Sequence, residues 1–329
     1  MKPSQVKTAI TTLLEQNIAI FLWGSPGIGK SSLIKQIAKE NNLEFIDLRL
    51  SLLDPTDLKG IPFFDKENHQ AVWASPSFLP KEGKGILFLD ELNSAPPSVQ
   101  ASAYQLILDR SIGEYSLPDG WKIIAAGNNE EDHGVIYKMA APLANRFIHF
   151  EMKIDIDEWL TWGYTHNIDY RILSYITYKN EALFEFDPNK KSFPTPRSWE
   201  FVSAILNTSL QGSILLDTLS GAIGEERAID FLQFCKVIDH LPNIEDIFNL
   251  NNPEYPQDEQ TLYALSSLLV SSYLNNPSPQ RLENLIHYLM QIKSEFSVLT
   301  IQELQKAGID MLESKMFEKW VDKFSYLLS

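Results

Sequence analysis

The sequence predicts an α/β fold in which a parallel sheet with helices on both faces is followed by an all-helical part. In the first half of the chain, short apolar segments alternate with segments of helical spacing, which is typical of a parallel sheet covered by helices. Beyond Lys153 the strand signals fade and helical spacing remains. Continuously apolar segments such as Ile86–Leu89 favour strands that are buried on both faces.

The strands predicted for the sheet are Ile18–Trp23, Phe45–Leu50, Ile86–Leu89, Lys122–Ala126 and Ile148–Met152. Apolar residues at helical spacing predict helices between and after them, over Ser31–Glu40, Val99–Leu108, Asp157–Trp162, Tyr170–Asn180, Ser198–Leu206 and Ala228–Ile238. Prolines and asparagines mark a break between Leu241 and Asp258. We therefore expect an α/β core over residues 1–152, a helical lid over 153–240 and a helical C-terminal region over 241–329.

Composition excludes several classes of protein. The 329 residues include 28 basic and 43 acidic ones, a net charge of −15, which disfavours sequence-independent binding to nucleic acid. The single cysteine, Cys235, allows no intramolecular disulfide and no paired-cysteine metal site. Residues 1–12 lack the apolar segment of a secretory signal, and no apolar run has the length of a membrane span. We expect a cytoplasmic protein without a membrane partner.

A phosphate-binding loop is the strongest local motif. Residues 24–31 match the pattern G-x-x-x-x-G-K-[ST] between a predicted strand and a predicted helix, as the motif requires. Glycines let successive backbone N–H groups turn toward phosphate oxygens, and the start of the helix adds its positive dipole end. The lysine would bridge the β- and γ-phosphates of ATP and the serine hydroxyl would bind Mg²⁺. The predicted nucleotide-binding residues are Gly24, Ser25, Pro26, Gly27, Ile28, Gly29, Lys30, Ser31 and Ser32.

Two acids follow the most apolar predicted strand. Asp90 and Glu91 end the segment Ile86–Glu91, which is similar to a Walker B motif. We predict that Asp90, together with Ser31, holds Mg²⁺, and that Glu91 orients and polarises the attacking water. The alternative is that the two acids only begin a solvated turn. The phosphate loop elsewhere in the chain favours the catalytic interpretation.

From these motifs onward the chain resembles the AAA+ ATPases, and among them the MoxR-like group, over about Ile18 to Ile205. The segment Asp90–Pro97 is similar to the "DE-x-N-x-APP" extension of Walker B in that group. Asp54–Gly60 and Trp73–Pro76 resemble the hairpin inserted into helix 2 of this clade, which commonly faces the central channel of the ring. The alternative for these two segments is an ordinary surface loop.

The resemblance implies three further site residues. Asn128, at the end of a predicted strand, stands where the family has its sensor 1, although Asn129 replaces the usual proline. Arg146 stands at the position of the arginine finger that completes a neighbouring subunit's site, and Asn145 replaces the usual aspartate before it. Arg197 resembles sensor 2 at the start of a lid helix and could act on its own or a neighbour's ATP. The respective alternatives are a turn-forming Asn-Asn pair, a helix-end salt bridge and a pairing with a carboxylate.

The sequence as a whole predicts Mg²⁺-dependent hydrolysis of ATP to ADP and phosphate, with Lys30, Glu91, Asn128, Arg146 and Arg197 as catalytic residues. By resemblance, the protein forms a homo-oligomeric ring, expected to be a hexamer, and acts in a chaperone-like way to remodel or mature a protein client, often one with a von Willebrand factor A domain. Two alternatives are a nucleic-acid motor and a nucleotide-binding scaffold without turnover. A small-molecule kinase shares the phosphate loop but lacks support from the other motifs.

Overall fold

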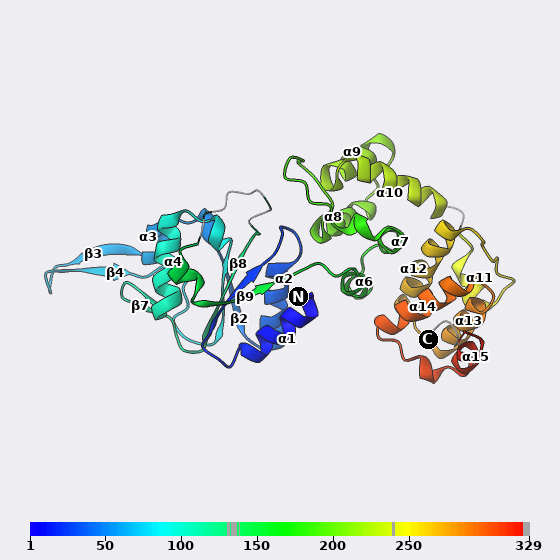
Figure 1. Cartoon of the computed structure of the whole chain (residues 1–329), viewed down its shortest axis with the longest axis horizontal. Coiled ribbons are helices and arrows are strands. Elements are labelled where there is room, and N and C mark those ends of the chain that lie inside the picture. The colour runs from blue at the N-terminus through cyan, green and yellow to red at the C-terminus, as the bar shows by residue number, and fades with distance from the viewer. Residues whose placement is uncertain (130–131, 133–136, 138, 239–240, 325–329) are drawn as a thin grey trace. The chain divides into compact units, whose positions relative to one another are not determined.

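The computed structural model describes residues 1–129, 132, 137, 139–238 and 241–324 (Figure 1). The chain divides into two compact units, Met1–Asp155 and Ile156–Ser329. The predicted separation of a lid from a C-terminal region at residue 240 stays a prediction. Within the described residues, no helix combines the length and the apolar character that crossing a membrane requires.

The first unit is built on a five-stranded sheet in the order β2-β5-β8-β1-β9, with every neighbouring pair parallel. The five predicted strands are confirmed, with each end shifted by one residue at most: β1 is Ala19–Trp23, β2 Glu44–Arg49, β5 Gly85–Asp90, β8 Trp121–Gly127 and β9 Phe147–Glu151. The remaining elements of the unit are α1 (Pro3–Leu13), α2 (Lys30–Glu40), η1 (Leu50–Leu52), α3 (Pro55–Lys59), β3 (Ile61–Asp65), β4 (Gln70–Ala74), η2 (Leu92–Ser94), α4 (Pro97–Asp109), β6 (Ser111–Ile112), β7 (Tyr115–Ser116) and α5 (Ala141–Ala144).

Helices cover both faces of this sheet, as predicted (Figure 1). Side chains alternate along a strand, so Ile20 and Leu22 of β1 join a buried cluster with α1 and α2, whereas Phe21 joins a second buried cluster with α4. Both clusters consist of apolar side chains that exclude water, and this burial is the main stabilising term of such a layer. The result is a rigid three-layer platform whose strands all end at one edge.

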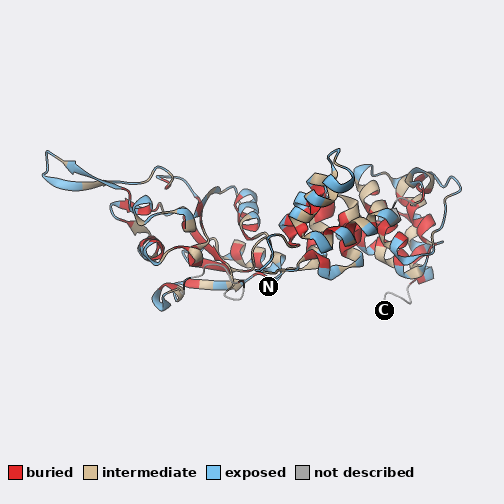
Figure 2. Cartoon of the chain, turned by 90° about the horizontal axis from the view of Figure 1, so that it is seen from above, coloured by how far each residue is buried: buried red, intermediate tan, exposed pale blue. Residues whose placement is uncertain are grey.

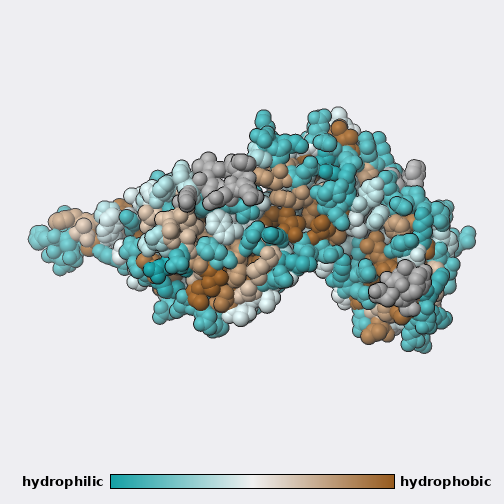
Figure 3. Space-filling view, viewed as in Figure 1, coloured by the Kyte–Doolittle hydropathy of each residue, from teal (hydrophilic) through white to brown (hydrophobic). Residues whose placement is uncertain are grey.

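A projecting hairpin interrupts the unit between η1 and β5. Strands β3 and β4 pair antiparallel after the short helix α3, so the expected inserted hairpin is present. It is exposed along most of its length and carries apolar residues among hydrophilic ones (Figures 2 and 3). Ile61, Phe63 and Phe64 are 64%, 58% and 65% exposed. The small hairpin formed by β6 and β7 was not predicted.

The second unit consists of helices throughout the residues that are described, which confirms the predicted change from α/β to all-α. Its elements are α6 (Ile156–Thr165), α7 (Tyr170–Tyr178), η4 (Asn180–Leu183), α8 (Pro196–Leu206), α9 (Gly212–Ile223), α10 (Glu225–Ile238), α11 (Ile244–Asn249), α12 (Glu259–Asn275), α13 (Pro279–Leu289), α14 (Ser294–Lys306), η5 (Met311–Glu313) and α15 (Lys315–Phe324). The predicted break between Leu241 and Asp258 contains the short helix α11.

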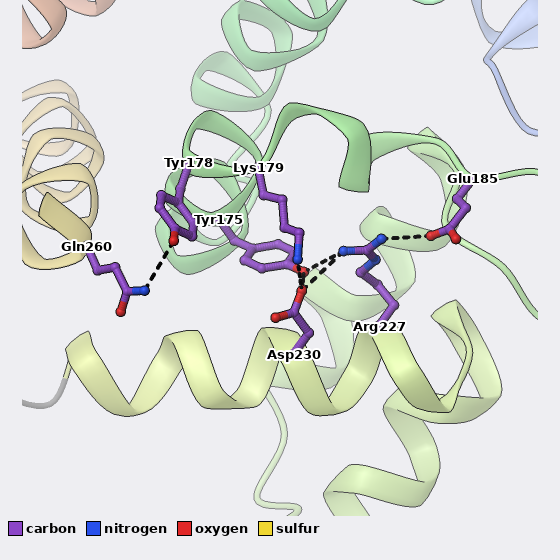
Figure 4. A network of polar contacts seen from close by, with 7 residues as sticks. All are labelled: Tyr175, Tyr178, Lys179, Glu185, Arg227, Asp230 and Gln260. Atoms are coloured by element: carbon purple, nitrogen blue, oxygen red, sulfur yellow. Dashed lines mark hydrogen bonds and ion pairs between the residues drawn. The ribbon is translucent and has the colours of Figure 1, made fainter.

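A polar network joins α7 to α10 in this unit (Figure 4). The carboxylate of Asp230 accepts hydrogen bonds from Tyr175 at 2.5 Å, from Lys179 at 2.7 Å and from Arg227 at 3.2 Å. Arg227 also donates to Glu185 at 2.8 Å. Burial raises the pKa of Asp230, but the hydrogen bonds from Lys179 and Tyr175 and the two cations outweigh it and lower the pKa. Nε of Arg227 is buried without a hydrogen-bond partner, and the other contacts of the network tie α7 to α10.

A carboxyl group whose pKa is raised instead of lowered lies between three helices of the same unit. Glu303 of α14 is 4% exposed, and it accepts hydrogen bonds from Tyr164 of α6 at 2.7 Å and from Thr177 of α7 at 3.4 Å. Burial raises the pKa of Glu303 to about 7, although both hydrogen bonds lower it. Glu303 is therefore protonated in the folded state over a pH range in which the unfolded chain is ionised.

This difference predicts a pH-dependent stability that Glu303→Gln removes. Because the folded-state pKa is raised, the stabilisation is fully present below pH 4.5 and is lost as the pH rises through about 7. Between pH 4.5 and 8 we expect the free energy of unfolding to fall relative to that of Glu303→Gln by roughly 3 kcal/mol, at about 1.4 kcal/mol per pKa unit. Denaturant titrations at both pH values measure this. The exposed Glu295 of the same helix provides the control Glu295→Gln, and equal pH dependence in all three proteins would contradict the prediction.

Candidate active site

The predicted phosphate loop connects the end of β1 to the start of α2. Gly29 is the N-cap of α2 and has a φ of +97°, in the left-handed region that a residue with a Cβ rarely adopts. A Cβ at Gly29 would meet nothing within 4 Å, so its backbone conformation, not lack of space, requires glycine. The loop lies at the carboxyl edge of the sheet, where parallel α/β folds bind ligands.

Lys30, the first residue of α2, is 8% exposed and turns its ammonium back into the loop. Its Nζ donates to the carbonyl oxygens of Gly24 at 2.5 Å and Ser25 at 3.1 Å, and to Oδ1 of Asn128 at 3.0 Å. A buried ammonium needs such oxygen partners, and phosphate oxygens would serve equally well. The contact with Asn128 joins two of the predicted catalytic residues, 98 positions apart in the sequence.

Ser31 and Asp90 meet as the Mg²⁺ prediction requires. The hydroxyl of Ser31 donates to Oδ2 of Asp90 at 3.0 Å, and Oδ1 of Asp90 accepts from the backbone N–H of Glu91 at 2.9 Å. A hydroxyl and a carboxylate are hard oxygen donors that suit Mg²⁺, which commonly takes few protein ligands and completes its shell with phosphates and water. No cage of three or more His, Cys, Asp or Glu occurs among the described residues, and this mode of binding needs none.

Glu91 occupies an unusual backbone position at the same edge. Its φ is +57°, in the left-handed region, and this directs the chain from β5 into η2. Its carboxylate accepts a hydrogen bond from the hydroxyl of Ser51, in the 3₁₀ turn η1 that follows β2. Ser51 was not predicted, because no motif marks it and only the pairing of β2 with β5 brings it to Glu91.

A third acid adds negative charge to this edge. Burial raises the pKa of Asp47, and the negative charges of Asp90 and Glu91 raise it further, against a lowering effect of Arg49. Asp47 belongs to β2, whose Arg49 is paired with Asp90 in the sheet. Asp47 was also missed, since its place beside the Walker B acids depends on strand order. The accumulated negative charge favours a bound divalent cation.

Asn128 is held in place by a second asparagine. The side chain of Asn93, which is 1% exposed, donates to the backbone carbonyl of Asn128 at 2.8 Å and accepts from its N–H at 3.2 Å. At Gly127, a Cβ would lie only 2.3 Å from Oδ1 of Asn93, so this clamp requires glycine there. Asn129 instead donates through its N–H to Asp132 at 3.0 Å. The structure therefore places Asn128, not Asn129, against Lys30.

Because Asn93 holds the backbone of Asn128, we predict that Asn93→Ala impairs the site although Asn93 is not one of the predicted catalytic residues. The change leaves a backbone donor and acceptor of Asn128 unpaired in a partly buried place, which we expect to cost about 2 kcal/mol of unfolding free energy. Because the side chain of Asn128 would then be poorly oriented, the turnover of ATP should fall about ten-fold. Thermal unfolding and phosphate release measure the two effects. Asn129→Ala is the matched control, and a larger loss of turnover in that variant would overturn the placement of Asn128.

Arg146 lies on the surface of the first unit, just beyond the end of α5. Its side chain is exposed and forms no ion pair with any residue in the described part of the chain. Its backbone N–H donates to the carbonyl of Leu143, which closes the short helix. The alternative of a helix-end salt bridge thus finds no partner among the described residues.

Arg197 belongs to the second unit and lies in the first turn of α8. Thr195 is the N-cap of this helix and Pro196 its first residue, two residues before the predicted start at Ser198, and the Thr195 hydroxyl accepts from the N–H of Ser198 at 3.0 Å. Arg197 is exposed, and no carboxylate among the described residues lies within ion-pair distance of it. Its charge lowers the pKa of Glu200, but the larger effect of burial leaves that pKa raised. The role of Arg197 at a nucleotide stays a prediction.

Comparison with known proteins identifies the segment that carries this site. Residues 19–149 match the "ATPase family associated with various cellular activities (AAA)". Protein MoxR of Methylorubrum extorquens is 24% identical over 135 residues, which are 39% of this chain and 38% of MoxR. The chain contains an AAA+ ATPase domain of the MoxR-like group. This AAA+ domain includes the phosphate loop, the Walker B acids, Asn128 and Arg146, while Arg197 lies outside the matched residues.

Solved structures with related folds are more distant. A mutant form of RuvB of Thermotoga maritima has a TM-score of 0.44 and 17% identity, and the similarity covers 86% of this chain and 88% of that one. NtrX of Brucella abortus, in complex with ADP, has a TM-score of 0.43 and 14% identity, over 98% of this chain and 68% of that one. The MoxR match spans 38% of the length of MoxR.

Proposed function

We propose that this protein is a Mg²⁺-dependent ATPase that hydrolyses ATP to ADP and phosphate. The observation that carries the proposal is the meeting of Lys30, Asn128, Ser31 and Asp90 at one edge of the sheet, with Glu91 beside them. These residues come from β1, β8 and β5, three adjacent strands, or from the segments that directly follow them. Each belongs to a residue type that phosphoryl transfer to water requires.

The residues divide the chemistry between them. Lys30 and the loop bind the β- and γ-phosphates, and the side-chain amide of Asn128 contacts the γ-phosphate or the attacking water. Glu91 accepts a hydrogen bond from that water and orients it in line with the bond to be broken. Ser31 and Asp90 would hold Mg²⁺, which neutralises the charge that develops on the phosphate oxygens. Arg197 would then couple the helical unit to the state of the nucleotide.

We propose further that Arg146 completes the site of a neighbouring subunit in a homo-oligomeric ring, expected to be a hexamer. The support is its exposed guanidinium without an ion pair in the described chain, at the position of the family's arginine finger. Such an arginine stabilises charge on the transferred phosphoryl group. Hydrolysis then depends on assembly, because an isolated subunit lacks this cation.

The client of the cycle would be a protein, remodelled or matured in a chaperone-like way. The β3–β4 hairpin supports this, because Ile61, Phe63 and Phe64 are exposed and suit contact with an apolar polypeptide segment. By resemblance to the MoxR-like group, the hairpin would face the channel of the ring, and a protein with a von Willebrand factor A domain would be a typical client. The net charge of −15 argues against a nucleic-acid client.

Phosphate release by the purified chain, with mass measured by light scattering, tests the proposal. With ATP and Mg²⁺ we expect steady release of phosphate, a requirement for the metal, and a specific activity that rises with protein concentration as rings assemble. A chain that stays monomeric and releases no phosphate at any concentration would overturn it and favour a binding scaffold. Stimulation of phosphate release by DNA or RNA at physiological salt would favour a nucleic-acid motor instead.

A further inference from the structure

We propose that Trp23 and His149 are positioning residues for Arg146. Trp23 lies at the end of the strand that leads into a subunit's own phosphate loop. Through His149 it would orient the arginine that the same subunit supplies to the site of its neighbour. This inference rests on the proposed function of Arg146 and adds to it a link between two consecutive sites of the ring. The link runs through two hydrogen bonds and one imidazole ring.

The first hydrogen bond joins β1 to β9. Trp23 is the last residue of β1 and directly precedes Gly24, where the phosphate loop begins. Its indole Nε1 donates to Nδ1 of His149 in β9 at 2.9 Å. An indole nitrogen can only donate, so Nδ1 of His149 must accept, and the proton of the neutral imidazole is assigned to Nε2.

The second hydrogen bond leads from His149 toward Arg146. Nε2 of His149 lies 2.8 Å from the carbonyl oxygen of Ala144, to which the assigned tautomer donates. Ala144 is the last residue of α5, and Arg146 follows two positions later. With only four residues, α5 cannot persist by its own hydrogen bonds and takes its position from the groups that contact it. His149 therefore fixes the end of the turn that presents Arg146.

Aromatic packing keeps this link rigid. The ring centroids of Trp23 and Phe21 are 4.3 Å apart, and those of Phe21 and Phe147 are 5.4 Å apart. Trp23 and His149 stack with centroids 6.0 Å apart and planes inclined by 23°. If packing were the only role of Trp23 and His149, their aromatic rings would be needed but their ring nitrogens would not. Here both nitrogens of His149 have partners at hydrogen-bond distance, so the polar link is additional to the packing.

The ring nitrogens of Trp23 and His149 also lie where their hydrogen bonds contribute little to the stability of the core. His149 is exposed and Trp23 half-buried, whereas Phe21 and Phe147 below them are buried. Hydrogen bonds at an exposed position contribute modestly to folding. A change in which the ring stays and the nitrogens go should therefore leave the fold intact and alter the orientation of the Arg146 turn. A displacement of about 1 Å at a catalytic cation can lower turnover by ten-fold or more.

A mixed-subunit assay separates this role from a general one. A finger donor, Glu91→Gln, offers Arg146 but cannot hydrolyse ATP, and a finger acceptor, Arg146→Ala, has an intact site without the arginine. Each alone should be almost inactive, and their mixture should regain phosphate release. We expect His149→Phe in the donor to lower this regained release about ten-fold. In the acceptor, which already lacks the Arg146 side chain, His149→Phe should lower the regained phosphate release by less than about two-fold.

Two additional variants sharpen the result. Trp23→Phe in the donor removes only the first hydrogen bond and should have the same direction of effect. His149→Gln in the donor keeps an N–H near the position of Nε2, so it should restore part of the release that His149→Phe loses. Thermal unfolding and binding of a fluorescent ATP analogue are measured for each variant, and we expect both to stay near those of the parent proteins.

Three outcomes would overturn the proposal. Equal losses with His149→Phe in donor and acceptor would mean a general structural role, and no loss in the donor would mean that Arg146 is positioned by other contacts. Failure of the unmodified mixture to regain any phosphate release would refute the in-trans role of Arg146, and with it this inference. That third outcome is seen before any change is made at Trp23 or His149, so it is distinguishable from the other two.

Discussion

Glu91→Gln is expected to lower the turnover of ATP at least about 100-fold, the usual contribution of a positioned general base, while nucleotide binding is retained. Glutamine has the size of glutamate and can still accept the hydrogen bond from Ser51, so the left-handed turn at Glu91 should persist. What is lost is the negative charge that polarises the attacking water. Lys30 and the phosphate loop are unchanged, so the affinity for ATP should stay within a few-fold of the original.

Phosphate release and equilibrium titration with a fluorescent ATP analogue measure the two quantities separately. Ser51→Ala is the matched control, because it removes the hydrogen bond to the carboxylate but leaves the charge of Glu91 in place. We expect a much smaller change of turnover in that variant than in Glu91→Gln. Unaltered phosphate release by Glu91→Gln would show that this carboxylate does not act on water and that the assignment of Walker B is wrong.

Arg146→Ala should keep ATP binding and ring assembly but lose most of the turnover, by about 10³-fold as for other arginines supplied to a phosphoryl-transfer site. The side chain is exposed and forms no ion pair in the described part of the chain, so its removal breaks no ion pair among the described residues. The loss arises only where the guanidinium would meet the phosphoryl group of an adjacent subunit. Stability of the isolated subunit should hardly change.

Single-turnover phosphate release at saturating ATP, together with light-scattering mass, measures the effect. Arg146→Lys is the informative companion, because it keeps a positive charge but loses the planar group that contacts two oxygens at once, and it should regain only part of the turnover. Weak nucleotide binding with normal turnover per bound ATP would contradict the in-trans role. That result would move Arg146 from the chemistry to the binding of its own subunit's nucleotide.

The sequence predicted those parts of the site that depend on short, contiguous patterns. The five strands follow from apolar runs flanked by turn-forming residues, and their ends were correct to within one residue. The phosphate loop and the acids at the end of β5 are local motifs, in which the residue types and their spacing carry the chemistry. The helix α8 was predicted from the spacing of its apolar residues, with its start placed two residues late at Ser198.

Residues brought to the site by strand order were missed. Asp47 and Ser51 lie near Asp90 and Glu91 because β2 pairs with β5, and no pattern in the sequence predicts that pairing. The backbone clamp on Asn128 by Asn93 likewise joins segments 35 residues apart. The signal that could have suggested Asn93 is its place three residues after Asp90, in the segment that resembles the MoxR-like group.

The amino-acid sequence by itself determined the α/β and all-α parts of this protein, the phosphate-binding loop and the identity of the acids beside it, because periodicity, glycine conformation and residue chemistry act over a few neighbouring residues. The tertiary structure decided which of two asparagines meets Lys30, which hydroxyl contacts Glu91, and that the indole of Trp23 reaches the turn before Arg146 through His149. These contacts form because a parallel sheet places the carboxyl ends of distant segments at one edge, an arrangement that depends on the packing of the whole first unit.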